Sequence, residues 1–253
     1  MEGKGKETQE MKSAIFEKQK GEMAYITGEE YHHLVKVRRI KRGELVRITD
    51  GAGKNYLAIV EYIDRIKKLV GVRIVSYNLN TELDFKLGLG FALIKKPRLE
   101  FLLEKCTELG VVEFIPLICE RSIVLKREIE ERWLKILKEA VKQSGRSRVP
   151  EIRKPLRLEK IEEIAENYNT WLFGDINGEK LIPEINPKGD ILIIIGPEGG
   201  FTENERKFLL SKGFLNVKLA KTILRAETAA ISACSQIIAV RETNGRRPKN
   251  ARR

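Results

Sequence analysis

The chain has 253 residues with 48 Lys and Arg against 36 Asp and Glu, a formal net charge of +12, and 42% of its residues are hydrophobic. This length suits one large domain or two modest ones, and the surplus of cations favours a nucleic-acid partner over mere solubility. No apolar run reaches the roughly 20 residues that span a bilayer, the charged N-terminal segment predicts no secretory signal, and the three cysteines form no CxxC pair, so we expect a reduced, cytoplasmic protein without a zinc site or disulfides.

The N-terminal third has the pattern of a small β-domain. Residues 1–13 predict an exposed leader, and residues 29–40 (EEYHHLVKVRRI) predict a short helix that runs into a basic turn. Residues 43–63 alternate apolar and polar side chains around Asp50 and Gly51, which is a hairpin signal, and residues 69–77 predict a further strand. We therefore expect a β-barrel-like domain over residues 14–78, followed by a linker at residues 78–82.

Beyond residue 82 the chain alternates strands and helices. Apolar runs at residues 83–94, 111–118, 171–175 and 191–195 predict buried strands, and apolar residues at helical spacing predict helices over 98–110 and around 133–141. Such alternation indicates a parallel sheet covered by helices on both faces, which we expect over residues 82–243. The last residues, RETNGRRPKNARR, predict a flexible basic tail.

The segment GPEGGFTENE, residues 196–205, follows a buried strand and leads into a helix. Thr202 and Glu205 have the spacing of a capping box, which marks the start of that helix. Glycines allow a ligand to approach the backbone closely or let the backbone take a positive φ. The spacing is neither that of a dinucleotide-binding turn nor that of a P-loop. The segment is therefore either an ordinary strand-to-helix turn or one wall of a pocket.

The segment LAKTILRAETAA, residues 219–230, has the same strand–loop–helix pattern. Its helix begins with small residues that allow tight packing, and Arg225 precedes them in the loop. Arg225 either pairs with Glu198 or Glu227 in a structural role or serves as a functional cation. The only histidines, His32 and His33, lie far away in the sequence, which argues against a Ser-His-Asp triad or a histidine metal cluster. Together the two segments predict a pocket for a small polar ligand.

These two segments resemble the signature loops of the SPOUT, or trefoil-knot, methyltransferases, and specifically the RsmE-type 16S rRNA (uracil-N3)-methyltransferases. Three upstream stretches agree with that family: EEYHHLVKVRRIKRGELVRITDGAG, ALIKKPRLEFLLEKCTELGVVEFIPLICERS and KEAVKQSGRSRVPEI. The resemblance covers residues 15–240 and is much more specific as a group than in any one loop. The leader and the basic tail lie outside it.

The resemblance implies an α/β fold in which a PUA-like β-barrel RNA-binding domain precedes a knotted, parallel-sheet methyltransferase domain. A knot is rare enough that pattern reasoning alone would reject it. The implied cofactor is S-adenosyl-L-methionine, and no metal is needed. The implied substrate is one uridine of 16S rRNA in the small ribosomal subunit. The family also implies a homodimer with its active site near the subunit interface.

The matched motifs assign the cofactor site to one strand end and two loops. Any of these residues is also compatible with an ordinary core position, above all Leu172, Ile195 and Leu219. Arg225 is the candidate catalytic cation for charge on the uracil oxygens, and Glu198, Glu227 or hydroxide is the candidate base, of which Glu198 is preferred. The expected cofactor-binding residues are Leu172, Phe173, Gly174, Ile195, Gly196, Pro197, Glu198, Gly199, Gly200, Leu219, Ala220, Thr222, Ile223, Leu224 and Arg225.

RNA binding requires cations that contact phosphates. Three basic clusters qualify, although a solvated charge run is the default interpretation of any one of them. They are Lys36, Arg38, Arg39, Lys41 and Arg42; then Lys95, Lys96 and Arg98; and finally Arg146 and Arg148.

Two other functions compete with base methylation. A ribose 2′-O-methyltransferase of the same superfamily is one, but its last motif is usually rich in Asn and TILRAETAA contains none. A non-catalytic RNA-binding assembly factor is the other, and the intact Gly-rich loop together with Arg225 argues against it.

Overall fold

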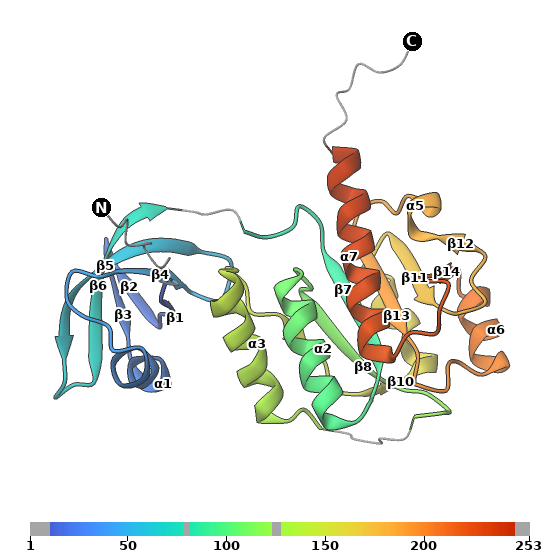
Figure 1. Ribbon diagram of the computed structural model, residues 1–253, viewed down its shortest axis with the longest axis horizontal. Helices are drawn as coiled ribbons and strands as arrows, with labels where there is room; N and C mark the ends of the chain where they lie inside the picture. Colours follow the sequence, from blue (N-terminus) through green and yellow to red (C-terminus); the bar gives the residue numbers. More distant parts are fainter. Residues whose placement is uncertain (1–10, 78–80, 123–127, 246–253) are drawn as a thin grey trace, which may run out of the picture. The chain divides into compact units, whose positions relative to one another are not determined.

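The computed structural model describes residues 11–77, 81–122 and 128–245 (Figure 1). The chain divides into two compact units, the first comprising residues 1–82 and 141–149 and the second residues 83–140 and 150–253. Most of the predicted leader, most of the predicted linker and most of the basic tail lie outside the described residues. Lys12, at the end of the predicted leader, forms a 2.6 Å ion pair with Glu44, and β1 begins at Ser13. The chain therefore joins the sheet before residue 14.

The first unit is built on a six-stranded sheet in the order β1-β4-β5-β6-β3-β2. The predicted hairpin is present, because β4 and β5 pair antiparallel on either side of residues 50–54, and only β1 and β4 run parallel. The predicted helix is a short α-helix that continues as a π-helical turn. The elements are β1 (Ser13–Ile15), β2 (Lys18–Lys20), β3 (Met23–Ile26), α1 (Gly28–His32), η1 (His33–Val37), β4 (Leu45–Thr49), β5 (Asn55–Asp64) and β6 (Leu69–Tyr77).

Alternation along these strands creates the core of the first unit. Val46 and Ile48 of β4 are buried together with Ala58 and Val60 of β5 and with Val72 of β6. Successive side chains of a strand point to opposite faces, so the residues between them are left for solvent or for other segments.

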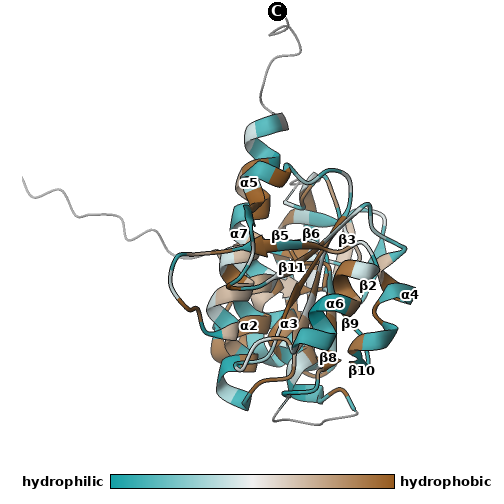
Figure 2. Cartoon of the chain, turned by 90° about the vertical axis from the view of Figure 1, so that its right-hand side faces the viewer, coloured by the Kyte–Doolittle hydropathy of each residue, from teal (hydrophilic) through white to brown (hydrophobic). Residues whose placement is uncertain are grey.

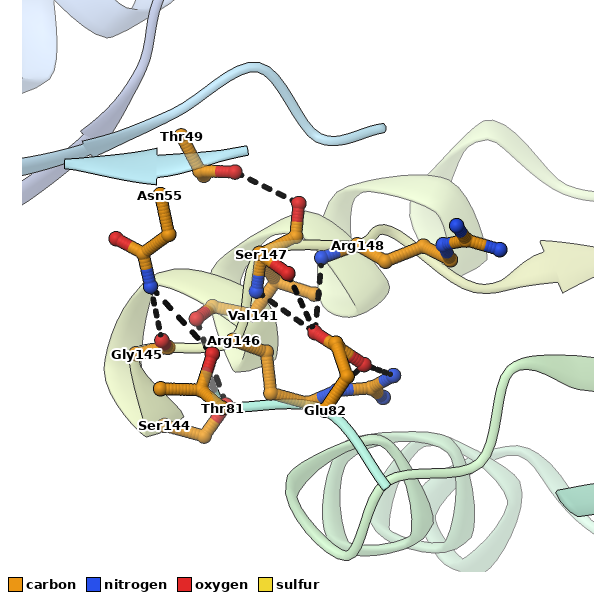
Figure 3. A network of polar contacts seen from close by, with 10 residues as sticks. All are labelled: Thr49, Asn55, Thr81, Glu82, Val141, Ser144, Gly145, Arg146, Ser147 and Arg148. Atoms are coloured by element: carbon orange, nitrogen blue, oxygen red, sulfur yellow. Dashed lines mark hydrogen bonds and ion pairs between the residues drawn. The ribbon is translucent and has the colours of Figure 1, made fainter. Parts of the chain in front are cut away.

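Residues 141–149 belong to the first unit although the residues on either side of them in the sequence belong to the second (Figure 3). They include the last four residues of α3 (Glu131–Ser144). The hydroxyl of Thr49 donates to the Ser147 carbonyl at 2.7 Å, and the Asn55 side-chain amide donates to the Gly145 carbonyl at 2.8 Å. Thr49 and Asn55 are both buried, so this segment supplies partners that their strands do not. The expected assignment of all residues from 82 to 243 to one domain therefore differs from the structure at this segment.

Glu82 fastens the same segment. Its carboxylate accepts from the Arg146 guanidinium at 2.5 Å, from the Ser147 amide at 2.8 Å and from the Arg148 amide at 3.1 Å. Burial raises the pKa of the Glu82 carboxyl. The hydrogen bonds and positive charge of Arg146, together with the hydrogen bonds from the amide and hydroxyl of Ser147, outweigh burial and leave this pKa below its ordinary value. The loop is therefore held by charge-assisted hydrogen bonds rather than by apolar packing alone.

The second unit contains an entirely parallel sheet in the order β10-β8-β7-β13-β11-β14-β12, with β9 beside β8. Its strands are β7 (Leu87–Ala92), β8 (Glu113–Ile118), β9 (Glu151–Ile152), β10 (Leu156–Arg157), β11 (Thr170–Gly174), β12 (Lys180–Leu181), β13 (Ile191–Ile195) and β14 (Leu215–Lys218). The helices are α2 (Lys96–Glu108), α3 (Glu131–Ser144), η2 (Leu158–Lys160), α4 (Glu162–Ala165), α5 (Ile182–Ile185), α6 (Glu203–Ser211) and α7 (Ala226–Gly245).

Helices cover both faces of this sheet, as the alternating pattern predicts. On one face Leu192 and Ile194 of β13 are buried with Ile161 and with Leu209 of α6, whereas α7 packs on β13, β7 and α2. Figure 2 shows hydrophobic colouring on the central strands and hydrophilic colouring on the outer side of helices such as α6. None of the helices in the described ranges is long and apolar enough to cross a membrane.

A buried polar network lies where β8 begins. Glu113 accepts from the Tyr168 hydroxyl, from the Lys86 ammonium at 2.9 Å and from the Arg153 guanidinium. Burial raises the pKa of Glu113, but the hydrogen bonds from Tyr168, Lys86 and Arg153 outweigh it, so this pKa lies below its ordinary value. Burial, with the neighbouring Glu113, also raises the pKa of Tyr168. The network closes the amino edge of the sheet, opposite the edge that carries the Gly-rich loop.

Candidate functional site

A cavity of about 300 Å³ lies at the carboxyl edge of the parallel sheet. The register pairs Gly174 of β11 with Ile195 of β13 and with Val217 of β14, so three adjacent strands end at one level. The loops that follow them form the walls, as is usual for ligand sites in parallel α/β sheets. The cavity is lined by Gly174, Asp175, Ile176, Ile195, Gly196, Pro197, Glu198, Gly199, Gly200, Phe201, Arg206, Leu219, Ala220, Thr222, Ile223, Leu224, Ala226 and Ala229.

The first wall is the Gly-rich loop, residues 196–200, together with Phe201. The Gly200 amide donates to the Pro197 carbonyl at 2.8 Å, and Gly200 has a φ of 68°, a conformation that favours glycine. A Cβ on Gly196 would lie 3.0 Å from the buried ring of Phe201. The capping box predicted between Thr202 and Glu205 is present and starts α6 directly after this wall. The loop is therefore a tight turn between a buried strand and a capped helix.

The second wall is the loop of residues 219–225, which joins β14 to α7. The Gln236 side-chain amide donates to the Leu219 carbonyl at 3.0 Å, and the Ala229 amide donates to the Arg225 carbonyl at 2.8 Å. Ala226 and Ala229 line the cavity from the first turns of α7. Their small side chains leave the space between the two walls open.

Most residues expected to bind a cofactor line this cavity, including Ile195 and Leu219, for which a core position was the alternative. Leu172 and Phe173 do not line it, because both point into the fully buried core. Arg225 is exposed beside the cavity and is not among its lining residues. The sequence did not single out six further lining residues: Asp175, Ile176, Phe201, Arg206, Ala226 and Ala229.

The charged groups around the cavity are paired differently from the sequence-based expectation. Glu198 pairs with Arg98, from the first turn of α2, and the same guanidinium lies 3.8 Å from the Glu227 carboxylate. Of the two alternatives for Arg225, the structural one, pairing with Glu198 or Glu227, is therefore not the one that the structure has. Within the described ranges Arg225 makes no side-chain hydrogen bond or ion pair, so its guanidinium is available to a ligand.

The basic turn of the first unit presents cations to solvent. Ile40 is buried and its amide donates to the Leu34 carbonyl at 3.0 Å, which anchors the turn on the core. Arg39 has a φ of 49°, an uncommon backbone conformation for a residue other than glycine. The exposed side chains are those of Lys36, Arg39, Lys41 and Arg42, and none of these four is ion-paired within the part of the chain that the structure describes; Arg38 is half-buried.

The other predicted RNA contacts separate into buried and exposed side chains. Arg146 is only 3% exposed and is paired with Glu82, so the prediction that it contacts RNA is wrong. Arg148 is exposed on the first unit, next to Gly53. In the second unit Lys95 is exposed, Lys96 lies 3.5 Å from Glu130, and Arg98 is engaged at the cavity.

Comparison with known families places both parts of the chain. Residues 81–238 match the RNA methyltransferase domain, and residues 26–72 match the RNA methyltransferase PUA domain. The chain is 33% identical over 227 residues to the ribosomal RNA small subunit methyltransferase E of Bacillus subtilis, covering 84% of this chain and 88% of the relative. It is 34% identical over 226 residues to the protein of the same name from Aquifex aeolicus, covering 87% and 95%.

Solved structures agree with this relationship over the whole fold. The ribosomal RNA small subunit methyltransferase E of Neisseria gonorrhoeae, bound to S-adenosyl methionine, superposes with a TM-score of 0.82 at 29% identity, covering 91% of this chain and 98% of that one. A putative methyltransferase of Legionella pneumophila in complex with the same cofactor gives a TM-score of 0.78 at 32% identity, covering 90% and 97%. The prediction of a parallel-sheet RNA methyltransferase domain after a PUA-like domain is thereby confirmed. The chain belongs to the ribosomal RNA small subunit methyltransferase E family.

Proposed function

We propose that the chain transfers a methyl group from S-adenosylmethionine to N3 of a uridine in small-subunit ribosomal RNA. The observation that carries this proposal is the cavity between the Gly-rich loop and the 219–225 loop, in a chain whose relatives include proteins solved with that cofactor. A volume of about 300 Å³ lies at the lower end of the range of ligand pockets, about 300–1,000 Å³.

The lining residues fit this cofactor chemically. Ile195, Leu219 and Leu224 offer apolar contacts for a flat base, and the backbone of residues 196–200 offers hydrogen-bonding groups without bulky side chains. Two polar residues, Asp175 and Thr222, also line the cavity, where the hydroxyl and amino groups of the cofactor need polar partners. When bound, S-adenosylmethionine supplies an activated methyl group, so the residues need only align the base and manage its charge.

Arg225 is the proposed catalytic cation. Removal of the N3 proton spreads negative charge onto O2 and O4 of the uracil, and a cation held near these oxygens stabilises that charge. Arg225 is exposed next to the cavity and makes no side-chain interaction within the described ranges. Of the candidate bases, Glu198 lines the cavity whereas Glu227 does not, and we therefore retain Glu198 as the proposed acceptor of the N3 proton.

The exposed cations of the basic turn, Lys36, Arg39, Lys41 and Arg42, are the proposed phosphate contacts. Each phosphate that the protein neutralises releases condensed counterions. Replacing Lys41 and Arg42 by Gln should therefore reduce the slope of log binding constant against log salt concentration by about 0.7–0.9 for each phosphate that is no longer neutralised. A filter-binding titration over several salt concentrations measures this slope. Replacing Arg146, which is buried, changes the slope only if the segment of residues 141–149 is displaced.

Methyl transfer from labelled S-adenosylmethionine to small ribosomal subunits and to naked rRNA tests the proposal. After digestion to nucleosides, we expect the label in N3-methyluridine. Label in a 2′-O-methyl nucleoside would instead support the ribose-methylating alternative. Binding of RNA without uptake of S-adenosylmethionine in calorimetry would support the non-catalytic assembly factor. Either result would overturn the proposed function.

We further propose that the chain is a homodimer that acts in the cytoplasm. The dimer is supported by Ile223 and Ile176, two apolar residues of the cavity wall that are 85% and 49% exposed in the single chain. A second copy of the chain would remove these side chains from water. Light scattering should give twice the mass of one chain, and Ile223→Asp should lower that mass; a monomeric wild-type chain contradicts the proposal.

A further inference from the structure

Three arginines from three different elements contact the Gly-rich wall of the cavity. Arg98, in the first turn of α2, pairs with the Glu198 carboxylate. Arg121, in the turn after β8, donates to the Gly199 carbonyl at 2.6 Å. Arg206, of α6, donates to the Phe201 carbonyl at 3.1 Å and to the Asp175 carboxylate at 3.2 Å. We call Arg98, Arg121 and Arg206 the arginine clamp.

Arg98 occupies a position that does not favour its own helix. The N-terminal end of a helix carries a partial positive charge, so a cation there is unfavourable, and the first turn of α2 has no acidic residue to offset it. Two carboxylates from elsewhere offset this charge instead, those of Glu198 and Glu227. The position of Arg98 is therefore explained by its two carboxylate partners and not by a contribution to the stability of α2.

Glu227 makes Arg98 a link between the two walls. It lies in the first turn of α7, directly after the 219–225 loop, and is only 7% exposed. One of its carboxylate oxygens is buried without a hydrogen-bond partner in the described structure. Without Arg98, this buried carboxylate and that of Glu198 would repel each other across the gap that the guanidinium fills. Arg98 thus sets the spacing between the Gly-rich wall and the wall that ends at α7.

Arg121 acts on the same wall from a turn that is itself fixed. The Glu205 carboxylate accepts from the Glu120 amide at 2.8 Å and, with its other oxygen, from the Thr202 amide at 2.8 Å. The turn that carries Arg121 is therefore tied to the cap of α6, which directly follows the Gly-rich wall. The stem of Arg121 also lies against Gly199, where an added Cβ would meet its Cδ at 3.3 Å.

We propose that the arginine clamp holds the cofactor cavity in its binding geometry, with Arg98 as the positioning residue that couples the two walls. This inference rests on the proposed function, because it concerns the site for S-adenosylmethionine. Arg98 then contacts neither the RNA nor the reacting atoms but acts through Glu198 and Glu227. A loop of small residues has little packing of its own, so its binding geometry depends on such external supports.

Calorimetric titration of Arg98→Gln with S-adenosylmethionine and with S-adenosylhomocysteine tests the inference. We expect both ligands to bind about tenfold more weakly, within the usual range of coupling energies. The two ligands separate geometry from charge. The methylated cofactor carries the positive sulfonium, so loss of a nearby cation alone would favour it, whereas a distorted cavity weakens both ligands in parallel. Unchanged or tighter binding of S-adenosylmethionine would overturn the inference.

Arg132→Gln is the matched control. Arg132, in α3, forms a comparable ion pair with Glu100, which lies two residues after Arg98 in α2, and one of its contacts is 2.7 Å long. Arg132 does not line the cavity. The Arg132→Gln substitution should leave both affinities unchanged. Arg121→Gln removes a second member of the clamp and, like Arg98→Gln, should weaken the binding of both ligands. Wild-type chain that fails to bind S-adenosylmethionine contradicts the proposed function, whereas wild-type binding with unaltered Arg98→Gln and Arg121→Gln contradicts only the clamp.

Steady-state kinetics distinguish positioning from contact with the substrate. Arg98→Gln should raise the KM for S-adenosylmethionine, whereas kcat at saturating cofactor should change only as far as the lost ion pair alters Glu198, the proposed base. Arg98→Lys should recover part of the affinity, because an ammonium pairs with one carboxylate but lacks the planar fork that reaches two. Glu227→Gln in the Arg98→Gln background should also recover part of it by removing the repulsion. A fall in RNA affinity at unchanged cofactor affinity would show that Arg98 contacts the substrate instead.

Discussion

Glu82→Ala removes the carboxylate that fastens residues 141–149 to the first unit (Figure 3). Glu82 accepts hydrogen bonds from the Arg146 guanidinium, from the amide and hydroxyl of Ser147, and from the Arg148 amide. The ion pair is largely buried, with the side chain of Arg146 3% exposed and that of Glu82 20% exposed. Removal of the Glu82 carboxylate therefore affects a charged group and two backbone amides at the same time.

Breaking a buried ion pair by removing one partner costs about 3–5 kcal/mol. Because water reaches part of Glu82, we place the expected loss near the lower end, at about 3 kcal/mol of the free energy of unfolding of the first unit. A single domain has about 5–15 kcal/mol in total, so this loss is a large fraction of its stability. Glu82→Gln keeps an acceptor but removes the charge and should cost less than Glu82→Ala.

Hydrogen exchange of peptides covering β4 and β5 measures the effect within the first unit. Trp133 and Trp171 both belong to the second unit, so tryptophan fluorescence reports on that unit and serves as an internal comparison. Glu61→Ala is the matched control, because Glu61 pairs with Arg73 at 2.6 Å on the exposed surface of the same unit, where such a pair contributes about 0–1 kcal/mol. If Glu82→Ala costs no more than Glu61→Ala, residues 141–149 are not held by this carboxylate.

Three further changes test other parts of the molecule. Gly196→Ala puts a Cβ 3.0 Å from the ring of Phe201, and because overpacking costs about 1–3 kcal/mol, calorimetry should show S-adenosylmethionine affinity reduced about tenfold. Arg225→Ala should lower kcat by about 100-fold or more with an unchanged melting temperature, since the side chain is exposed; unaltered methyl transfer would remove Arg225 from the mechanism. The pKa of Glu113 is lowered in the folded chain, so its stabilisation is complete above about 4.5, the ordinary value, and is lost as the pH falls below it; urea titrations followed by tryptophan fluorescence should show Glu113→Gln to be less pH-sensitive there.

The two walls of the cavity could be predicted from sequence because their signals are local. Glycine, the capping box at Thr202 and Glu205, and small residues at the start of α7 all act within a few residues of the chain. Phe201, Ala226 and Ala229 lie within the two predicted segments, residues 196–205 and 219–230, although the motifs do not assign them to the cofactor site. Asp175 and Arg206 lack such a signal, because their ion pair joins the end of β11 to α6, and these two segments approach each other only in the folded chain.

The residues that support the cavity could not be predicted from the sequence, for the same physical reason. Arg98 and Arg121 contact residues about one hundred and about eighty positions further along the chain. From the sequence alone, a basic residue at a helix start is therefore predicted to contact RNA, the usual function of an exposed cation on a positively charged chain. Its two carboxylate partners, which give the residue a different role, become visible only when α2, the Gly-rich loop and α7 are brought together.

Residues 144–148 show why composition alone could not assign the RNA contacts. In SGRSR the two arginines have nearly the same local sequence, yet Arg146 is buried against Glu82 while Arg148 is exposed. Desolvating a guanidinium is costly, so the buried one requires a carboxylate, and Glu82 lies more than sixty residues earlier in the chain. The one local hint is a pair of polar residues, Thr49 and Asn55, on strands whose other buried positions are apolar. Buried polar groups need partners, and residues 141–149 provide them. A polar residue at a core position of a predicted strand is therefore evidence for a distant segment docking there. By that argument the first unit includes residues 141–149, and a fragment ending at residue 82 should lack the carbonyls of Ser147 and Gly145, to which Thr49 and Asn55 donate, and should unfold more readily than the intact chain.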